Sequence, residues 1–522
     1  MTLKAALATF AATTCMTSLA YAGDLTRVAT VPLNAEITGL FVHGDDLFMN
    51  VQHPSANLPN AFAKATVGVI ANFNAHARAH VAPTDDAAKQ VVSTSMGDYQ
   101  ILIQQGDFGK IGVITGAAGD ILTSNDPDFN AFVSTGNNAG YLFTSWENRP
   151  GGMSRVMIKR AEDGTWAADE SDAKMLDFSR VGGTWVNCFG TLSPWGNPLS
   201  SEELYFDDTA EWNNPAYRYV SGVETLAAYL GSYPNPYRYG YIVEITDPAG
   251  TATPVKAFAM GRFSHENAVV MPDQKTVYLS DDGTNVVFFK FVADTAGDLG
   301  AGTLYAAKIN QQGRAGSDPA TTALGISWVE LAHGNKDEIT TWIAEYDGIT
   351  QGDKIAGETN YISDADVAAW AAGKAVDNRV AFLESRKAAL ARGATAEFRK
   401  MEGVNINYDA AADGSVPYMY LAMSEITKGM SDAKGDLQLA PNKCGVVYEM
   451  KLDDIFNVSL MTPAIAGGPY DMANTPNACD INAISNPDNL VVLGDGTVLI
   501  GEDTGRHENN ALWAYRPAHG AK

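Results

Sequence analysis

The chain has 522 residues and carries 61 acidic against 36 basic side chains, which gives a formal net charge of −25. A chain with this negative charge repels nucleic acids and anionic membranes, and neither is expected as a partner. We expect a monomeric protein whose ligands are small molecules. The 49 glycines, 21 tyrosines and 20 phenylalanines, set among many short apolar runs, favour one large all-β body over several domains.

The first 22 residues have the pattern of a secretory signal peptide. Lys4 precedes an apolar stretch, and the segment ends in small residues at Ala20 and Ala22. This stretch is too short and too weakly apolar for a membrane span. We therefore expect cleavage before Gly23, a periplasmic or secreted protein, and a single catalytic domain over residues 23–522.

Six short apolar strands, each finishing on polar groups, recur along the chain. They end at Gln52 and His53, Glu147 and Asn148, Glu203, Asp281 and Asp282, Glu425, and Glu502 and Asp503. Such strands, repeated around a closed ring, predict a six-bladed β-propeller with long insertions between its blades, whose strand ends converge on a central channel. Carboxylates gathered at one channel mouth repel each other unless cations lie among them, which indicates bound metal. The alternative is that these residues only terminate strands as turn formers.

The four cysteines are Cys15, Cys188, Cys444 and Cys479, and the first lies in the predicted signal peptide. In an oxidising compartment Cys444 and Cys479, which are near in sequence and border strand-like runs, are predicted to pair. Cys188 then remains odd. It is either a small buried hydrophobic residue or a soft metal ligand, and Glu203 fifteen residues later supplies the hard oxygen that calcium prefers.

One insertion is expected to be helical. Residues 363–392 are rich in Ala, Leu, Lys and Glu with apolar residues at helical spacing, Ser363 and Asp364 are candidate N-caps, and Gly393 is a suitable stop. Residues 317–359 before it are predicted to form a loop-rich cap. The whole insertion is placed at residues 317–395.

Four segments, in order along the chain, resemble the PhoX-type alkaline phosphatases, which are secreted phosphomonoesterases. They are TWVNCFGTLSPWGNPLSSEE, GRFSHENAVVMPDQKTVYLSDDGTN, FLESRKAALARGATAEFRKMEGV and NACDINAISNPDNLVVLGDGTVLIGED, and they span most of the chain from about Gly140 to Trp513. The resemblance implies a six-bladed propeller that holds iron (Fe3+) and calcium (Ca2+), with a cysteine thiolate on iron. The matching residues are Cys188, Glu266, Glu402 and Asp503.

Three features depart from that family. The signal segment lacks a twin-arginine pair, and the segment AEITGLFVHGDDLFMNVQHPS, expected near the C-terminus, stands at residues 35–55. A closed ring tolerates this shift because every blade stays complete. Lys400 stands where many members have an arginine two residues before the glutamate, and a lysine offers a point charge instead of a two-pronged fork.

These observations assign roles to nine residues. The expected metal ligands are Cys188, Glu203, Glu266, Glu402, Asp503 and Glu147, with the thiolate on iron and the carboxylates on calcium or bridging two metals. The candidate catalytic residues are Lys400, Arg262 and His265, for binding phosphate or transferring protons. If Glu266 faces the metals, His265 points to the other side of its strand. The alternatives are a calcium-dependent propeller lactonase, which needs no odd thiol, and a non-catalytic, calcium-stabilised binding protein.

Overall fold

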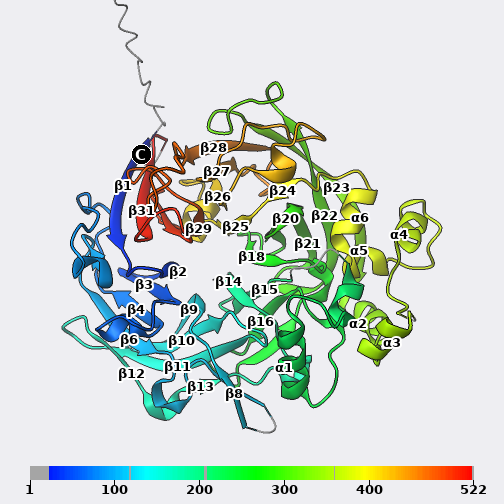
Figure 1. The fold of residues 1–522 in the computed structure, drawn as a ribbon, viewed down its shortest axis with the longest axis horizontal. Coiled ribbons are helices and arrows are strands. Elements are labelled where there is room, and N and C mark those ends of the chain that lie inside the picture. The colour runs from blue at the N-terminus through cyan, green and yellow to red at the C-terminus, as the bar shows by residue number, and fades with distance from the viewer. Residues whose placement is uncertain (1–22, 117–118, 205–207, 358, 520–522) are drawn as a thin grey trace, which may run out of the picture.

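The computed structural model describes residues 23–116, 119–204, 208–357 and 359–519. Its regular structure is mostly β, as predicted, and the larger antiparallel sheets are arranged around a common centre (Figure 1). The predicted signal peptide, residues 1–22, lies outside the described residues. Among the helices of the described ranges, none combines the length and the apolar character needed to cross a membrane.

The first half of the chain builds three of these sheets. One joins β2 (Glu36–His43), β3 (Asp46–Gln52), β4 (Thr66–Ile70) and β6 (Tyr99–Gln104). The next joins β9 (Pro127–Gly136), β10 (Ala139–Trp146), β11 (Gly152–Arg160) and β12 (Trp166–Ala168), with β13 (Lys174–Met175) also on β11. The third joins β14 (Asn187–Leu192), β15 (Pro198–Glu202), β16 (Ile242–Thr246) and β17 (Thr253–Lys256).

The second half builds a nine-stranded sheet that consists of two parts. The first part contains β18 (His265–Val270), β19 (Thr276–Asp281), β21 (Phe289–Thr295), β22 (Asp298–Gln311) and β23 (Leu324–Asn335). The second contains β25 (Met401–Asn405), β26 (Tyr418–Met423), β27 (Val446–Lys451) and β28 (Leu460–Ala466). Only the pairing of Leu324 and Gly325 with Met461 and Leu460 joins β23 to β28, so the two parts behave as neighbouring sheets.

The last large sheet unites the two ends of the described chain. It contains β29 (Pro487–Val492), β30 (Val498–Glu502), β31 (Ala511–Pro517) and β1 (Gly23–Thr30), and the two-residue β5 (Ser93–Thr94) adds to β1. β1 pairs with β31 from Gly23–Pro517 to Thr30–Ala511, and Figure 1 shows the two strands side by side. This pairing of the first strand with the last closes the arrangement of sheets.

One strand of each sheet, or part of a sheet, lies nearest the common centre. These inner strands are β2, β9, β14, β18, β25 and β29, and each contacts the next in this order, with β29 returning to β2 (Figure 1). Separate apolar cores fill the spaces between neighbouring sheets, such as the cluster of Phe48, Phe132 and Trp146 between the first two. The burial of these side chains holds the sheets together around the centre.

The six polar-ended strands predicted from the sequence are confirmed as strands. They are β3, β10, β15, β19, β26 and β30, and each is the second strand from the centre in its sheet. The predicted disulfide between Cys444 and Cys479 is also confirmed, and Cys188 is a free, buried cysteine.

The helical insertion exists, but it is divided. It consists of α4 (Asp364–Ala371), α5 (Arg379–Leu383) and α6 (Ser385–Ala391). Ser363 caps α4 by accepting from the Asp366 backbone N–H, and Gly393 has a φ of 82° after α6, where a glycine avoids the strain of a side chain. Two breaks, at residues 372–378 and at Glu384, separate the pieces.

The prediction that residues 317–359 form a loop-rich cap is wrong. This stretch contains β23, which pairs with β22 along its length, followed by α2 (Lys336–Ala344) and α3 (Gln351–Ala356). Buried side chains of α2 and α5, among them Ile339, Ile343 and Phe382, pack into the same core as the strands. Figure 1 shows α2, α4, α5 and α6 on the outside of the sheets, and α1 (Val220–Leu230) at another part of the periphery. The short α7 (Tyr408–Ala412) follows β25 in the chain.

Candidate metal centre

The sheets present equivalent backbone positions to the centre. In each, the last residue of the second strand pairs with a residue at the start of the inner strand. In five sheets the residue that directly follows the second strand also makes a backbone hydrogen bond to the inner strand's side. It donates its N–H to the carbonyl of the residue that precedes the paired residue of the inner strand. These bonds run from Glu147 to Asp126, Glu203 to Val186, Asp282 to Ser264, Ser424 to Lys400, and Asp503 to Asn486, with N···O distances of 2.9 to 3.3 Å. The same local geometry is therefore built five times.

In five of the six inner strands the second residue belongs to what we call the inner ring. Its members are Asp128, Cys188, Glu266, Glu402 and Asp488, and all five are buried. The pairing of each inner strand with its second strand changes register close to this position, as in a β-bulge. Bulges re-aim side chains next to active sites, so a repeated bulge accounts for the convergence of the five side chains. Ile37 takes the equivalent place in the β2 sheet.

Cys188 lies at the middle of this ring. Its Sγ is 2.9 Å from Asp128 Oδ2 and 3.1 Å from Glu266 Oε2. Its other neighbours are Glu147 and Glu203, each of which directly follows a second strand. Potential ligand atoms form three groups, and within each group these atoms lie within 4.8 Å of one another. The groups are Asp128–Glu147–Cys188, Cys188–Glu203–Glu266 and Glu266–Glu402–Asp488. Five of the six predicted ligands are thus brought together: Cys188, Glu203, Glu266, Glu402 and Glu147.

The sixth predicted ligand, Asp503, lies beside the ring. Burial first, and then the neighbouring Asp503 and Asp488, raises the pKa of Glu36, at the start of β2, well above its ordinary value, and Asp503 also stands within electrostatic reach of Asp488. Sequence reasoning missed Asp128, Asp488 and Glu36. Two of these residues share a sequence feature that could have indicated them: a Pro-Asp pair begins their inner strands, as Pro127-Asp128 and Pro487-Asp488.

So many carboxyl groups in one buried place disfavour their own ionisation. Burial first, and repulsion from neighbouring carboxylates second, raises the pKa of Asp128 and of Glu402 to about 7 and that of Glu147 to about 8. The same causes raise the pKa of Glu266 and of Asp488 well above their ordinary values. Burial and the carboxylates of Asp128, Glu203 and Glu266 likewise raise the pKa of the Cys188 thiol. A bound cation would reverse these shifts.

Two buried oxygens of this cluster support the same conclusion. Asp128 Oδ1 and Glu266 Oε1 have no hydrogen-bond partner within the described part of the chain. Buried polar atoms are nearly always satisfied, so an unsatisfied oxygen on each of the two carboxylates that contact the Cys188 thiol is consistent with ligation of a cation. The donor set of one thiol and several carboxylates suits a thiophilic metal together with hard cations.

Backbone strain precedes three of the ring residues. Val186, Lys400 and Asn486, each two residues before a ring residue, have φ values of 46°, 50° and 44°. Asparagine tolerates this left-handed region, but a β-branched valine there costs on the order of 1–3 kcal/mol. The strain recurs at equivalent positions beside Cys188, Glu402 and Asp488, so it belongs to the geometry that directs these side chains to the centre.

A buried acid–base pair lies behind three of the strand ends. Glu202, the last residue of β15, forms a 2.8 Å ion pair with Lys256, and Glu502, the last residue of β30, lies 3.0 Å from His507 Nδ1. Asp281, the last residue of β19, is held by Arg386. Each acid is followed directly by a residue that faces the centre, so these pairs fix the backbone from which Glu203, Asp282 and Asp503 project.

Lys400 lies at the edge of the cluster. Its Nζ is 2.9 Å from Glu402 Oε1 and 3.5 Å from Asp282 Oδ2, and its side chain is 28% exposed. Burial disfavours the Lys400 charge, but attraction by Asp282, Glu402 and Asp503 outweighs it and raises the Lys400 pKa well above its ordinary value. The structure therefore places a stable, partly accessible ammonium group next to the candidate ligands.

The other two candidate catalytic residues are not brought into the cluster. Arg262 is buried, and its Nε and Nη1 donate to the carbonyls of Pro236, Tyr239 and Leu383 and to Thr209 Oγ1. These contacts connect the sheets to α5. His265 stacks on Phe263, bonds the Gly261 carbonyl and lies on the opposite side of β18 from Glu266. Burial lowers the pKa of His265 to about 3, so the ring is neutral.

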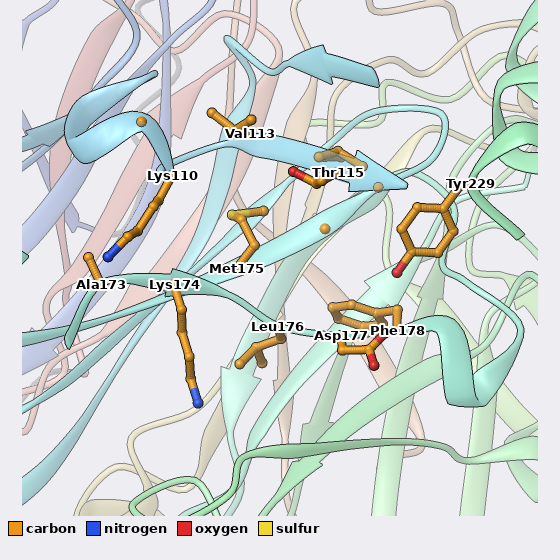
Figure 2. A pocket seen from close by; sticks show the side chains of 14 residues that line it. Lys110, Val113, Thr115, Ala173, Lys174, Met175, Leu176, Asp177, Phe178 and Tyr229 are labelled. Carbon is orange, nitrogen blue, oxygen red and sulfur yellow. The ribbon is translucent and has the colours of Figure 1, made fainter. Parts of the chain in front are cut away.

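Two cavities of the described part of the chain differ in their relation to this centre. One, of about 480 Å³, lies on the outside between β7 (Val113–Gly116) and β13, and Figure 2 shows Lys110, Lys174 and Tyr229 around it. None of the ring residues lines it. The other, of about 620 Å³, is lined by Glu36 and Asp503 and therefore adjoins the cluster.

Comparison with known proteins decides the family. The model of the alkaline phosphatase PhoX family matches residues 160–518. The chain belongs to this family. It is therefore an enzyme of the phosphoric monoester hydrolase class. The family match begins after Asp128 and Glu147, so these two ligand candidates are supported by the geometry of this chain alone.

The fold is similar to that of a solved PhoX structure. PhoX of Pseudomonas fluorescens, in complex with vanadate, a transition state analogue, has 20% identity and a TM-score of 0.53, with 76% of this chain and 79% of that chain covered. A putative 6-phosphogluconolactonase of Bacteroides fragilis has 10% identity and a TM-score of 0.30, with 91% and 87% covered. A Trypanosoma rangeli sialidase in complex with the inhibitor DANA has 9% and 0.34, with 94% and 55% covered. Nothing is inferred from the last two. A comparison with curated proteins finds no match.

Proposed function

We propose that this chain is a metal-dependent alkaline phosphatase that hydrolyses phosphate monoesters at the inner ring, in the channel of a six-bladed β-propeller formed by residues 23–522. The single observation that carries the proposal is the placement of Cys188 among Asp128, Glu147, Glu203 and Glu266. Six inner strands in mutual contact, and a pairing of β1 with β31, support the propeller.

The residues present fit the implied ions. We assign iron to Cys188, because thiolates are good ligands for iron and poor ones for calcium, and calcium to the carboxylates of the ring together with Glu147, Glu203 and Asp503. When bound, such cations neutralise the phosphate dianion and lower the pKa of a coordinated water. The unsatisfied oxygens of Asp128 and Glu266 are the observation that supports this assignment.

Lys400 is the proposed phosphate-binding residue. Its ion pairs with Glu402 and Asp282 hold the ammonium group at the edge of the ring while leaving part of it accessible. In this position it would donate hydrogen bonds to a phosphate oxygen and add to the stabilisation of charge in the transition state. An ammonium group makes single hydrogen bonds where the guanidinium of an arginine makes two parallel ones.

The cellular setting is proposed to be the periplasm or the outside of the cell. The Cys444–Cys479 disulfide supports it, because such bonds persist in oxidising compartments. Residues 1–22 are proposed as the export signal, and the protein is proposed to act as a monomer.

Hydrolysis of p-nitrophenyl phosphate by variants tests the function. Glu266→Gln is expected to lose nearly all activity, because Glu266 belongs to two of the three ligand groups. Glu330→Gln makes the same chemical change at an exposed position on β23 and is expected to behave as wild type. Equal activity of the two variants would contradict the proposed site.

A further inference from the structure

The cavity beside the inner ring has properties that suggest which esters the enzyme prefers. We call it the rim cavity; it has a volume of about 620 Å³, and its lining includes Asn34, Glu36, His53, Asp503, Gly505 and Glu508. Cavities of 300–1,000 Å³ are the usual size for small-molecule sites. Glu36 and Asp503 both line it, at the side where the carboxylate cluster ends.

One wall of the rim cavity is a fixed loop. Pro476 reaches it from the loop between β28 and β29, which the Cys444–Cys479 disulfide ties to the neighbouring sheet. The same loop also binds the segment after β30, because Asn477 Oδ1 accepts from the Glu508 backbone N–H at 2.9 Å. A covalent and hydrogen-bonded attachment of this kind keeps a cavity wall in place.

The opposite wall comes from the β2–β3 sheet, which lies outside the residues matched by the family model. Here the fivefold pattern breaks: His53 follows β3 but donates its backbone N–H to Asn125, in the neighbouring segment, and has a φ of 33°. Its ring bonds the Asn34 carbonyl at 3.1 Å through Nδ1 and pairs with Glu36 through Nε2. The irregular sheet thereby opens space beside the ring instead of contributing a further carboxylate to it.

The lining combines uncharged polar residues, acids and two histidines, and both histidines are already paired with an acid, His53 with Glu36 and His507 with Glu502. Asn34, Thr504 and Asn510 offer uncharged polar groups, while Glu36, Asp503 and Glu508 are acidic. Among the described residues, the lining contains no lysine or arginine, and the cation paired with Glu508, Lys89 at 2.8 Å, lies outside it. A negatively charged group in this cavity would meet these acids and would have to compete with them for basic groups that are already paired, whereas hydroxyl groups find donors and acceptors.

We propose that the rim cavity receives the alcohol part of the phosphate monoester and selects uncharged, hydroxyl-bearing alcohols over those that carry a carboxylate. The proposal rests on the proposed phosphatase function. It makes the β2–β3 sheet, with Asn34, Glu36 and His53, the part of this chain that determines specificity.

The test compares two esters of the same size on the metal-containing full-length protein. Glycerol 3-phosphate and 3-phosphoglycerate differ by a hydroxymethyl group against a carboxylate, and the ratio of their kcat/KM values is expected to favour glycerol 3-phosphate about tenfold or more. The expected size corresponds to leaving one charge unpaired in a partly solvated site.

Variants at two glycines show whether the cavity causes this preference. Gly505 lines the cavity, has open space at its Cβ position and a φ outside the left-handed region, so it accepts a side chain. Gly505→Arg supplies the missing cation and is expected to reduce the ratio at least fivefold, whereas Gly505→Ala should leave it unchanged. Gly494 is equally open but lies in the turn between β29 and β30, away from the cavity, so Gly494→Arg controls for net charge.

Each outcome is decisive. A ratio near one in the wild-type protein, or an equal change in Gly505→Arg and Gly494→Arg, would overturn the rim cavity as the alcohol site while leaving the phosphatase function intact. Phosphate release from neither ester nor from p-nitrophenyl phosphate would instead overturn the proposed function, and the cavity with it. If Gly505→Arg does not fold, Glu508→Gln, which removes an acid from the same wall, is expected to shift the ratio in the same direction.

Discussion

Cys188 Sγ lies 2.9 Å from Asp128 Oδ2, although 60 positions separate the two residues in the chain. They meet because each is the second residue of an inner strand, on neighbouring sheets whose inner strands, β9 and β14, are in contact. The contact between this buried thiol and this buried carboxyl group adds little stability by itself, because burial disfavours the charged form of both groups. The proposed cation, bound by both residues, would account for their proximity.

Replacement of Cys188 tests its assignment to iron. Cys188→Ala is expected to remove the iron and, with it, any absorbance band from thiolate-to-ferric charge transfer. The double variant Cys444→Ser and Cys479→Ser, which alters sulfur only in the disulfide, should keep the band. Elemental analysis and absorption spectra of both proteins provide the measurement. A band that survives in Cys188→Ala, or wild-type protein with calcium alone, would refute the assignment.

Replacement of Lys400 tests the phosphate-binding role. Lys400→Ala should lower kcat/KM for phosphate monoesters by about an order of magnitude or more, because a charged donor to the transition state is lost. Lys400→Arg should retain or improve activity, since a guanidinium bonds two phosphate oxygens at once. Steady-state kinetics of the two variants give the answer. Unchanged kcat/KM in Lys400→Ala would leave the lysine with only its ion pairs to Glu402 and Asp282.

The carboxylate cluster predicts how the stability of metal-free protein depends on pH. Asp128, Glu402 and Glu147 have pKa values of about 7, 7 and 8 in the folded chain, against about 4 in an unfolded chain. Between pH 4 and 8 the folded state therefore binds more protons than the unfolded state, so its stability falls as pH rises.

This dependence is measured by urea unfolding of chelated protein. The free energy of unfolding at pH 8 should be lower than at pH 5 by on the order of a few kcal/mol, and Glu147→Gln should reduce the difference. Restored metal should abolish it. Chelated protein that is equally stable, or more stable, at pH 8 would show that these carboxyl groups do not repel one another as described.

The pair of Lys256 and Glu202 predicts a loss of stability. Both side chains are almost completely buried and their charged atoms are 2.8 Å apart, so Lys256→Met leaves a buried carboxylate without its cation and should cost about 3–5 kcal/mol. The double variant Lys256→Met and Glu202→Gln should recover part of this loss. Chemical denaturation of the variants measures it.

The matched control for this pair is Lys387→Met, which breaks an ion pair with the exposed Asp364. Exposed pairs contribute at most about 1 kcal/mol, so this variant should be nearly as stable as wild type. Similar losses in Lys256→Met and Lys387→Met would mean that Glu202 does not depend on its buried partner.

The sequence predicted the second strands better than the inner ones. Strands such as β19 and β30 end in two adjacent acids, and a polar pair after an apolar run is visible in one dimension. Asp128 and Asp488 stand at the beginning of their strands, where a carboxylate looks like an ordinary turn residue. Only the register of the inner strand against its neighbour shows that these positions are equivalent to Cys188.

Two other segments lie differently from what the sequence indicated, for different physical reasons. Arg262 has the strand parity expected of a residue facing the centre, but it precedes β18, and backbone carbonyls brought in by distant segments take up its donors. The stretch at residues 317–359 lacks a clear alternation of apolar and polar residues, yet pairing with β22 stabilises β23 as a strand. Tertiary contacts decided both cases.

The proposed phosphatase activity depends most directly on the bound metals. Phosphate release from p-nitrophenyl phosphate should be measured on the purified protein, after removal of metals with a chelator, and after return of iron and calcium together. Chelation is expected to abolish hydrolysis, neither ion alone is expected to restore it, and both ions together should do so. Undiminished hydrolysis by protein from which elemental analysis shows both metals to be removed would contradict this expectation.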